Sequence, residues 1–239
     1  MGVTDTLSSL ESAPEASEVR IWLDLPDSYL PLPLLDIDNV LATAEVTLSE
    51  LCPPERQDLL YATLGTFSTL LDELAARNAV YCGLGWHESP TDGAVVSSTL
   101  VVSIQLMGPE ERSPRLVLGD LVTAAADSGD QAQADLVDLA NGPALFVESV
   151  RSLPRPTLPG QSGEPGMADV YQLQVTVPSP KGEWVVVLEF STPQVEYGVL
   201  YREMMILLAN SVAFTAPPGS GQGGIMAGHI HDLLGGGRT

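Results

Sequence analysis

The feature that most constrains the fold is the segment at residues 170–214, where two strand patterns are followed by a helical one. Apolar residues at every second position from Tyr171 to Val177 alternate with polar ones, which predicts a strand with one buried face. Turn residues follow at 179–182, and residues 184–190 are almost continuously apolar, so this second strand is predicted to be buried on both faces. Residues 195–212 then predict a long apolar helix that lies on the sheet.

Two amphipathic helices are predicted upstream of this segment. The first covers residues 38–51, with Asp38 as its N-cap, and the second begins near Glu55 after two prolines. The apolar stripe of the first comprises Val40, Leu41, Ala44, Leu48 and Leu51. The stripe of the second comprises Leu60, Leu64, Phe67, Leu71 and Leu74. The second stripe lasts only about two heptads, so we expect it to pack against the sheet; a coiled-coil seam is the alternative.

The rest of the chain between residues 19 and 150 alternates strand patterns with turns. Strands are predicted at 19–25, 80–86, 95–107, 136–139 and 144–150, and a helix at 116–126. Pro26, Pro31 and Pro33 predict an irregular connection after the first strand, and Gly83 with Gly85 predicts a bulge or a large side chain crossing above them. Short connections indicate an α+β fold with a largely antiparallel β-sheet covered by helices on both faces.

The chain is predicted to contain one domain with two tails. Residues 1–18 are acidic and lack periodicity, which indicates disorder, and residues 19–215 form the sandwich domain. Residues 154–166 hold four prolines and three glycines and predict a long loop inside that domain, and residues 216–239 form a Gly-rich tail. Neither a signal sequence nor an apolar run of about 20 residues is present, so we expect a cytoplasmic protein with no membrane span.

The charge of the chain limits its partners. With 31 acidic and 10 basic residues the formal charge is -21, which disfavours binding to nucleic acid. An acidic surface serves solubility in many proteins, and an acidic face that meets a basic partner is the functional alternative. Cys52 and Cys82 have no metal-site or redox spacing, so we interpret them as partly buried thiols.

Few residues suggest chemistry. His87 stands beside Glu88 at a strand end, where an ordinary edge residue is a simpler interpretation than a base. The cluster of His229, His231 and Asp232 has the donor atoms for a transition metal but lies in the Gly-rich tail. Residues 219–224 match G-x-G-x-x-G but follow a helix, whereas a dinucleotide site requires a preceding strand. We therefore predict a non-enzymatic protein without cofactor or metal.

The tail contains a short apolar island that a simple flexible end would not need. The island comprises Ile225, Met226, Ile230, Leu233 and Leu234. The last three are spaced i, i+3, i+4, so one helical turn would place them in the groove of a partner. A flexible tether raises the effective concentration of such a segment. Docking in trans, folding back onto the domain and no role at all remain open.

The order of these elements resembles the Mog1/PsbP-like α/β/α sandwich family, particularly its LpqN-like members in actinobacteria. The residues that carry the resemblance are a W-x-x-x-P pattern at 22–26, the helix from Glu55, an L-x-x-G-P-A hairpin at 139–144 and the segment 170–214 with its F-S-T-P motif. The resemblance covers about residues 19–215. It implies the sandwich fold and the binding of other proteins, and it supplies no shared active site.

These features lead to one functional hypothesis and two alternatives. The first is a protein-binding adaptor or chaperone-like accessory subunit of a bacterial multiprotein or secretion assembly. The second is an acidic immunity protein that caps a basic toxin. The third is a small-molecule or enzymatic role in a cleft under the loop at residues 154–166.

Overall fold

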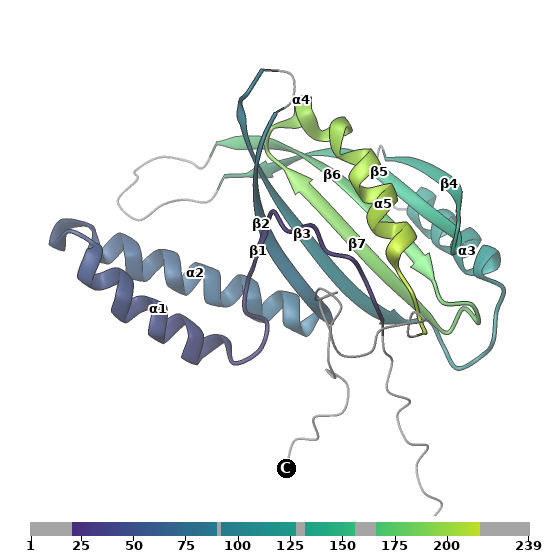
Figure 1. Ribbon diagram of the computed structural model, residues 1–239, viewed down its shortest axis with the longest axis horizontal. Helices are drawn as coiled ribbons and strands as arrows, with labels where there is room; N and C mark the ends of the chain where they lie inside the picture. The colour runs from purple at the N-terminus through teal and green to yellow at the C-terminus, as the bar shows by residue number, and fades with distance from the viewer. Residues whose placement is uncertain (1–20, 90–91, 128–131, 156–165, 216–239) are drawn as a thin grey trace, which may run out of the picture.

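A seven-stranded antiparallel sheet forms the frame of the protein (Figure 1). The computed structural model describes residues 21–89, 92–127, 132–155 and 166–215. The strand order is β1-β2-β3-β7-β6-β5-β4. The strands are β1 (Tyr29–Pro31), β2 (Ala79–Glu88), β3 (Val95–Leu106), β4 (Gln133–Leu139), β5 (Gly142–Pro154), β6 (Met167–Pro178) and β7 (Trp184–Thr192). The helices are α1 (Ile37–Leu51), α2 (Gln57–Ala76), α3 (Pro114–Asp127), α4 (Val195–Gly198) and α5 (Arg202–Ser211), with short 3-10 turns η1 (Pro54–Arg56) and η2 (Val199–Tyr201).

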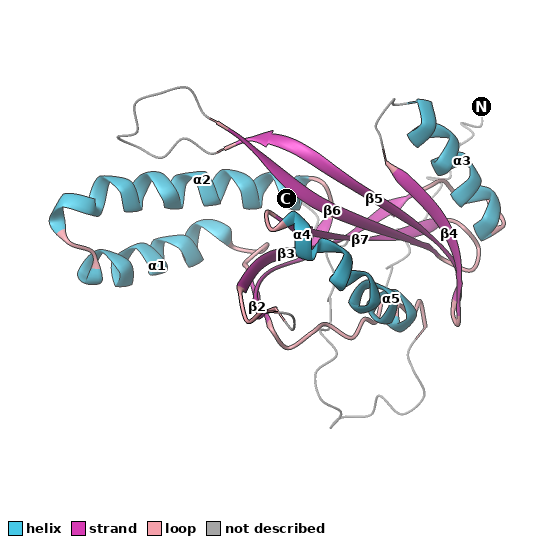
Figure 2. Ribbon diagram, turned by 90° about the horizontal axis from the view of Figure 1, so that it is seen from above, coloured by secondary structure: helices cyan, strands magenta, loops and turns pink. Residues whose placement is uncertain are grey.

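Strand β7 occupies the centre of the sheet, as its apolar run predicts. It pairs with β3 on one side and with β6 on the other. Its even-numbered residues, such as Leu188 and Phe190, belong to the main buried cluster together with Met205 of α5. Val185 and Val187 instead pack with Val117 of α3 on the opposite face. Figure 2 shows α5 and α3 on opposite sides of the sheet, which confirms the predicted α+β sandwich.

The helix predicted at residues 195–212 is present as the succession α4, η2 and α5. It lies over the main cluster, into which it inserts Met205, Leu208 and Ala209. At its far end Ala213 pairs with Trp22 in an isolated antiparallel bridge. The C-terminal helix therefore ties the beginning of the described chain to its end.

The N-terminal strand differs from the prediction. Of residues 19–25, the first two lie outside the described ranges, and only Trp22 makes a bridge. The edge strand is instead the three-residue β1, which pairs Tyr29 with Gly85 inside the segment predicted to be irregular. A proline is tolerated at Pro31 because an edge strand needs bonds on one side only. The connection at its other end is a turn in which Tyr29 N donates to Pro26 O at 3.3 Å.

The glycines of β2 are explained by side chains that cross them. The Tyr81 ring covers Gly83, and Tyr29, His87 and Ser98 crowd Gly85 so closely that neither position has room for a Cβ atom. The second of the two predicted explanations is therefore confirmed.

Helices α1 and α2 form a hairpin that extends away from the sheet in both ribbon views (Figures 1 and 2). Helix α2 packs along α1 and reaches the sheet only next to β2, so the prediction that it packs against the sheet is wrong for most of its length. The face of β3 that points away from α5 is mixed, because Thr99 and Ser103 flank Val101, so it offers a helix less apolar surface than the opposite face. Leu71 is the only fully buried residue of its predicted stripe.

Candidate functional site

The histidine considered as a base is partly buried and joins a small polar cluster. His87 Nε2 is 3.0 Å from Ser98 Oγ, which is also 3.0 Å from the Tyr29 hydroxyl. Burial lowers the pKa of His87, and its ring contacts the rings of Tyr29 and Tyr201. Ser98 is only 4% exposed, and its hydroxyl is shared between two side chains. This geometry fits a structural contact in the core better than a nucleophile with its base.

The other residues considered for chemistry are placed as follows. Both cysteines are free; Cys52 is half-buried at the end of α1, and burial of Cys82 raises its pKa to about 11. Cys82 is therefore a protonated, packed thiol at neutral pH. Within the described ranges, no group of three or more His, Cys, Asp or Glu residues gathers as a metal site would require. The following predicted residues lie outside those ranges: Gly219 to Gly224, Ile225, Met226, His229, Ile230, His231, Asp232, Leu233 and Leu234.

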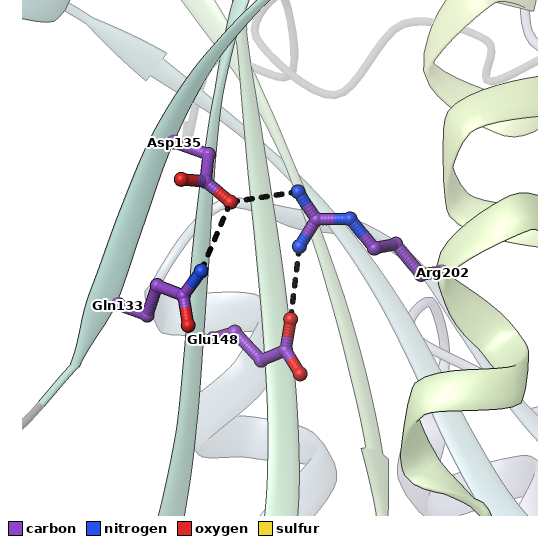
Figure 3. Close-up of polar contacts among 4 residues, drawn as sticks. All are labelled: Gln133, Asp135, Glu148 and Arg202. Carbon is purple, nitrogen blue, oxygen red and sulfur yellow. Dashed lines mark hydrogen bonds and ion pairs between the residues drawn. The ribbon is translucent and has the colours of Figure 1, made fainter.

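A three-residue ion pair network joins α5 to the edge of the sheet (Figure 3). Arg202 donates to Glu148 Oε2 at 2.9 Å and to Asp135 Oδ2 at 2.8 Å, while its guanidinium lies 5.4 Å from the centre of the Phe146 ring. Gln133 also donates to Asp135 Oδ2, at 3.4 Å. These side chains are partly buried, and every charge has an opposite partner. We interpret the network as a clamp that fixes the start of α5.

We expect Arg202→Met to lower the free energy of unfolding by about 1–2 kcal/mol, because two partly buried carboxylates lose their shared cation. The measurement is urea-induced unfolding followed by circular dichroism. The matched control is Arg115→Met, which removes a solvent-exposed pair with Asp138 at 2.6 Å and is expected to change stability by less than about 0.5 kcal/mol. Equal losses in the two variants would contradict the role of the clamp.

One small pocket lies beside α3. It has a volume of about 190 Å³ and is lined by apolar side chains such as Val185 and Val187, with Gln105, Arg151, Gln174 and Thr176 as polar groups. Sites for drug-sized ligands have volumes of about 300–1,000 Å³. The pocket is therefore a weak candidate for the small-molecule role considered above.

The largest group of exposed apolar side chains in the N-terminal half belongs to the hairpin and the chain that enters it. These residues are Leu35, Val40, Val46, Leu48, Leu51, Tyr61 and Leu70. No residue of α1 or α2 belongs to the two buried clusters of the domain. Two helices packed on each other cover only one side of each, so apolar side chains on the remaining sides stay in water. These exposed side chains make the hairpin a candidate interaction element.

A shallow, open face of about 640 Å³ lies along α1, and all of its lining residues belong to that helix or its N-cap. The residues that line it recur every three or four positions along one helix face: Asp36, Asn39, Val40, Thr43, Ala44, Thr47 and Leu48. Thr43 donates its hydroxyl to Asn39 O at 2.9 Å, and Thr47 donates to Thr43 O at 3.2 Å. The two hydroxyls are therefore satisfied inside the helix and need no partner from outside.

The two helices of the hairpin carry charge of one sign, whereas Arg56 lies in the turn between them and Arg77 caps the end of α2. Its two helices carry six carboxylates, and neither helix contains Lys or Arg. The carboxylates belong to Asp38, Glu45, Glu50, Asp58, Asp72 and Glu73. Neither helix can therefore form the internal acid–base pairs that usually decorate a solvated helix surface.

The sequence predicts the hairpin helices but not their exposure. Of the predicted α1 stripe, Val40 is 43%, Leu48 41% and Leu51 78% exposed. Two signals in the sequence point to this exposure. One is the absence of cations from both helices. The other is the presence of threonines, whose hydroxyls bond within the helix, at positions where residues with free hydrogen-bonding groups would normally face water.

Comparisons of the chain with protein-family models, with curated proteins and with solved structures find no match. The resemblance to the Mog1/PsbP-like family is thus a prediction that rests on the motifs quoted above. Within the described ranges, no helix combines the length and the hydropathy needed to cross a bilayer.

Proposed function

We propose that the protein is a non-enzymatic adaptor or accessory subunit that binds another protein in a bacterial multiprotein or secretion assembly. The sandwich serves as the frame, and the α1/α2 hairpin serves as the binding element. The Mog1/PsbP-like resemblance, a cytoplasmic location and the docking of the tail at Ile225 to Leu234 belong to the same proposal.

The observation that carries the proposal is the projection of the hairpin with its apolar side chains exposed. Val40, Leu48 and Tyr61 are each more than 40% exposed, although α1 and α2 pack on each other. Keeping apolar side chains in water forfeits about 25 cal/mol per Å² of burial. Coverage by a partner explains their presence on this surface.

The acidic immunity protein is a second candidate that one observation favours. A hairpin with six carboxylates and no basic residue in its helices fits the surface of a basic toxin. Both candidates are protein binders, and they differ in the identity of the partner and in the salt dependence of the complex.

The test is recovery of the partner from the source bacterium with the full-length tagged chain, followed by reconstitution of the purified pair. We expect the two purified proteins to elute as one stoichiometric complex. The variant Val40→Ser/Leu48→Ser should lose the complex, because the apolar contacts of the hairpin are removed while its charge is unchanged.

The matched control is Leu116→Ser/Leu207→Ser, which changes two leucines on α3 and α5 that are 62% and 72% exposed. The control should retain the complex. A complex that survives the hairpin variant and is lost in the control would refute the hairpin as the binding element. A purified chain that turns over a substrate would refute the adaptor role.

A further inference from the structure

We infer that the apolar island of the tail, Ile225 to Leu234, folds back on its own chain and covers the outer face of the C-terminal helix. This outer face comprises Val199, Leu200, Glu203 and Leu207, all of them exposed. The inference does not depend on the adaptor role, and it adds a step to that role: a tail that docks on a partner has first to leave this face.

The outer face is apolar and open to solvent. Val199 is 59%, Leu200 45% and Leu207 72% exposed. Leu200, Glu203 and Leu207 follow one another at spacings of three and four residues, so they lie along one side of the helix. The opposite side carries Met205, which is fully buried in the main cluster. Covering the outer face would therefore remove several large apolar side chains from water.

The chain that continues from this helix supplies a segment within reach. Helix α5 ends at Ser211, and Ala213 is held by its bridge to Trp22, so the tail starts at the end of the helix itself. Residues 216–224, which are rich in glycine, separate Thr215 from the island. A flexible chain of this length spans about 16–19 Å, whereas the helix rises only about 10 Å between the two leucines of the outer face. The linker is therefore long enough to place the island over this face.

The island also has a pattern that fits a helix surface. Its residues Ile230, Leu233 and Leu234 are spaced i, i+3, i+4, so one helical turn would present all three on one side. A short tether gives such a segment an effective concentration on the order of millimolar at a site near its attachment point. A contact that is weak between separate molecules is therefore largely formed within one chain.

Charge favours the tail over a second copy of the chain. The helix that carries the outer face adds the exposed carboxylates of Glu196 and Glu203. The tail contains one acidic residue, Asp232, and one arginine, whereas all other acidic residues of the chain precede residue 216. A second copy would bring the same two carboxylates and a formal charge of -21 against the first. The tail approaches the outer face without this repulsion.

The exposed face of α1 is an alternative site for the island. Both ribbon views show the hairpin extending away from the sheet on the side of β1 and β2 (Figures 1 and 2). Helix α5 instead contacts β4, β6 and β7. Because the tail starts at the end of α5, a short linker favours the outer face over α1.

The first test is hydrogen exchange of the full-length protein, measured by mass spectrometry. We expect the amides of residues 225–234 to exchange at least about tenfold more slowly in the wild type than in Leu200→Ser/Leu207→Ser. The matched control is Leu116→Ser, at a residue that is 62% exposed on α3, and it should leave the protection unchanged. Circular dichroism confirms that each variant is folded, and the α1/α2 hairpin is unchanged in both.

The second test measures whether the outer face is occupied. The probe is a synthetic fluorescein-labelled peptide of residues 222–236, and its binding to full-length protein is followed by fluorescence anisotropy. The tail variant Ile230→Ser/Leu233→Ser should bind the peptide at least about tenfold more tightly than the wild type, whose own tail competes for the site. Adding Leu200→Ser/Leu207→Ser to the tail variant should abolish this binding, and a peptide of the same composition in scrambled order should not bind.

Four outcomes would overturn the inference. Wild-type amides of residues 225–234 that exchange as fast as those of the free peptide would show that the island docks nowhere on the chain. Protection that persists in Leu200→Ser/Leu207→Ser would exclude the outer face. Protection lost in Val40→Ser/Leu48→Ser instead would identify α1 as the site. Protection that appears only together with a dimer in sedimentation would identify the tail of a second copy as the cover.

Discussion

Replacing Phe190 with alanine is expected to lower the free energy of unfolding by about 3–5 kcal/mol. Phe190 lies on the central strand β7 and is 1% exposed. Its ring stacks on Tyr201 with centroids 4.5 Å apart and meets Tyr171 edge-on at 6.4 Å. Alanine would leave a cavity between β7, β6 and the C-terminal helix. These elements can move together only in part, so the cavity would remain.

Guanidinium chloride unfolding at 25 °C measures this loss. Phe190→Leu retains most of the volume and should cost about 1–2 kcal/mol, so it keeps the comparison possible if the alanine variant does not fold. The control is Leu106→Ala, at a residue that is 61% exposed on β3, and its effect should be below about 0.5 kcal/mol. Similar losses for Phe190→Ala and Leu106→Ala would contradict a central position for β7.

The second large effect is expected for Gly198→Ala, at the end of α4. Gly198 has ordinary helical dihedral angles, with φ -52° and ψ -45°, so helix propensity alone predicts that alanine stabilises the protein by up to about 1 kcal/mol. However, a Cβ atom at this position would overlap the ring of Tyr171. Tyr171 is fixed in the core on β6, so the backbone would have to shift, and we expect a net loss of about 2 kcal/mol.

The sign of the change in unfolding free energy therefore decides between helix propensity and the overlap with Tyr171. Gly119→Ala is the matched control, because Gly119 lies in α3 and nothing stands within 4 Å of the position that an alanine Cβ atom would take there. This control should gain about 0.5–1 kcal/mol in thermal or chemical unfolding. A gain at Gly198 as well would show that the helix does not lie against Tyr171 as described.

The core of the fold is predictable because its signals are local. The alternation from Tyr171 to Val177 and the continuous apolar run of β7 each report burial within a few residues, and the structure confirms both strands. Asn78, with φ 60°, ends the α2 segment with a residue type that tolerates the left-handed conformation. The Arg202 clamp joins residues 54 and 67 positions apart, so no local pattern could reveal it.

The helices of the hairpin follow from the sequence, but their environment does not. An amphipathic stripe shows which face of a helix avoids water, but it does not show whether the cover comes from the same chain. Leu60 and Leu64 of α2 are partly buried, whereas Val40 and Leu48 of α1 stay exposed, although both stripes have helical spacing. The candidate site depends on this difference, which only the tertiary arrangement supplies.

Both margins of the sheet are poor templates for the addition of another strand. On one side β1 has three residues and ends in a proline, and on the other β4 carries Asp135 and Asp138. Short strands, prolines and charges at edges prevent the edge-to-edge pairing that leads to aggregation. The exposed apolar side chains of the hairpin are therefore not accompanied by a sheet edge that invites strand addition.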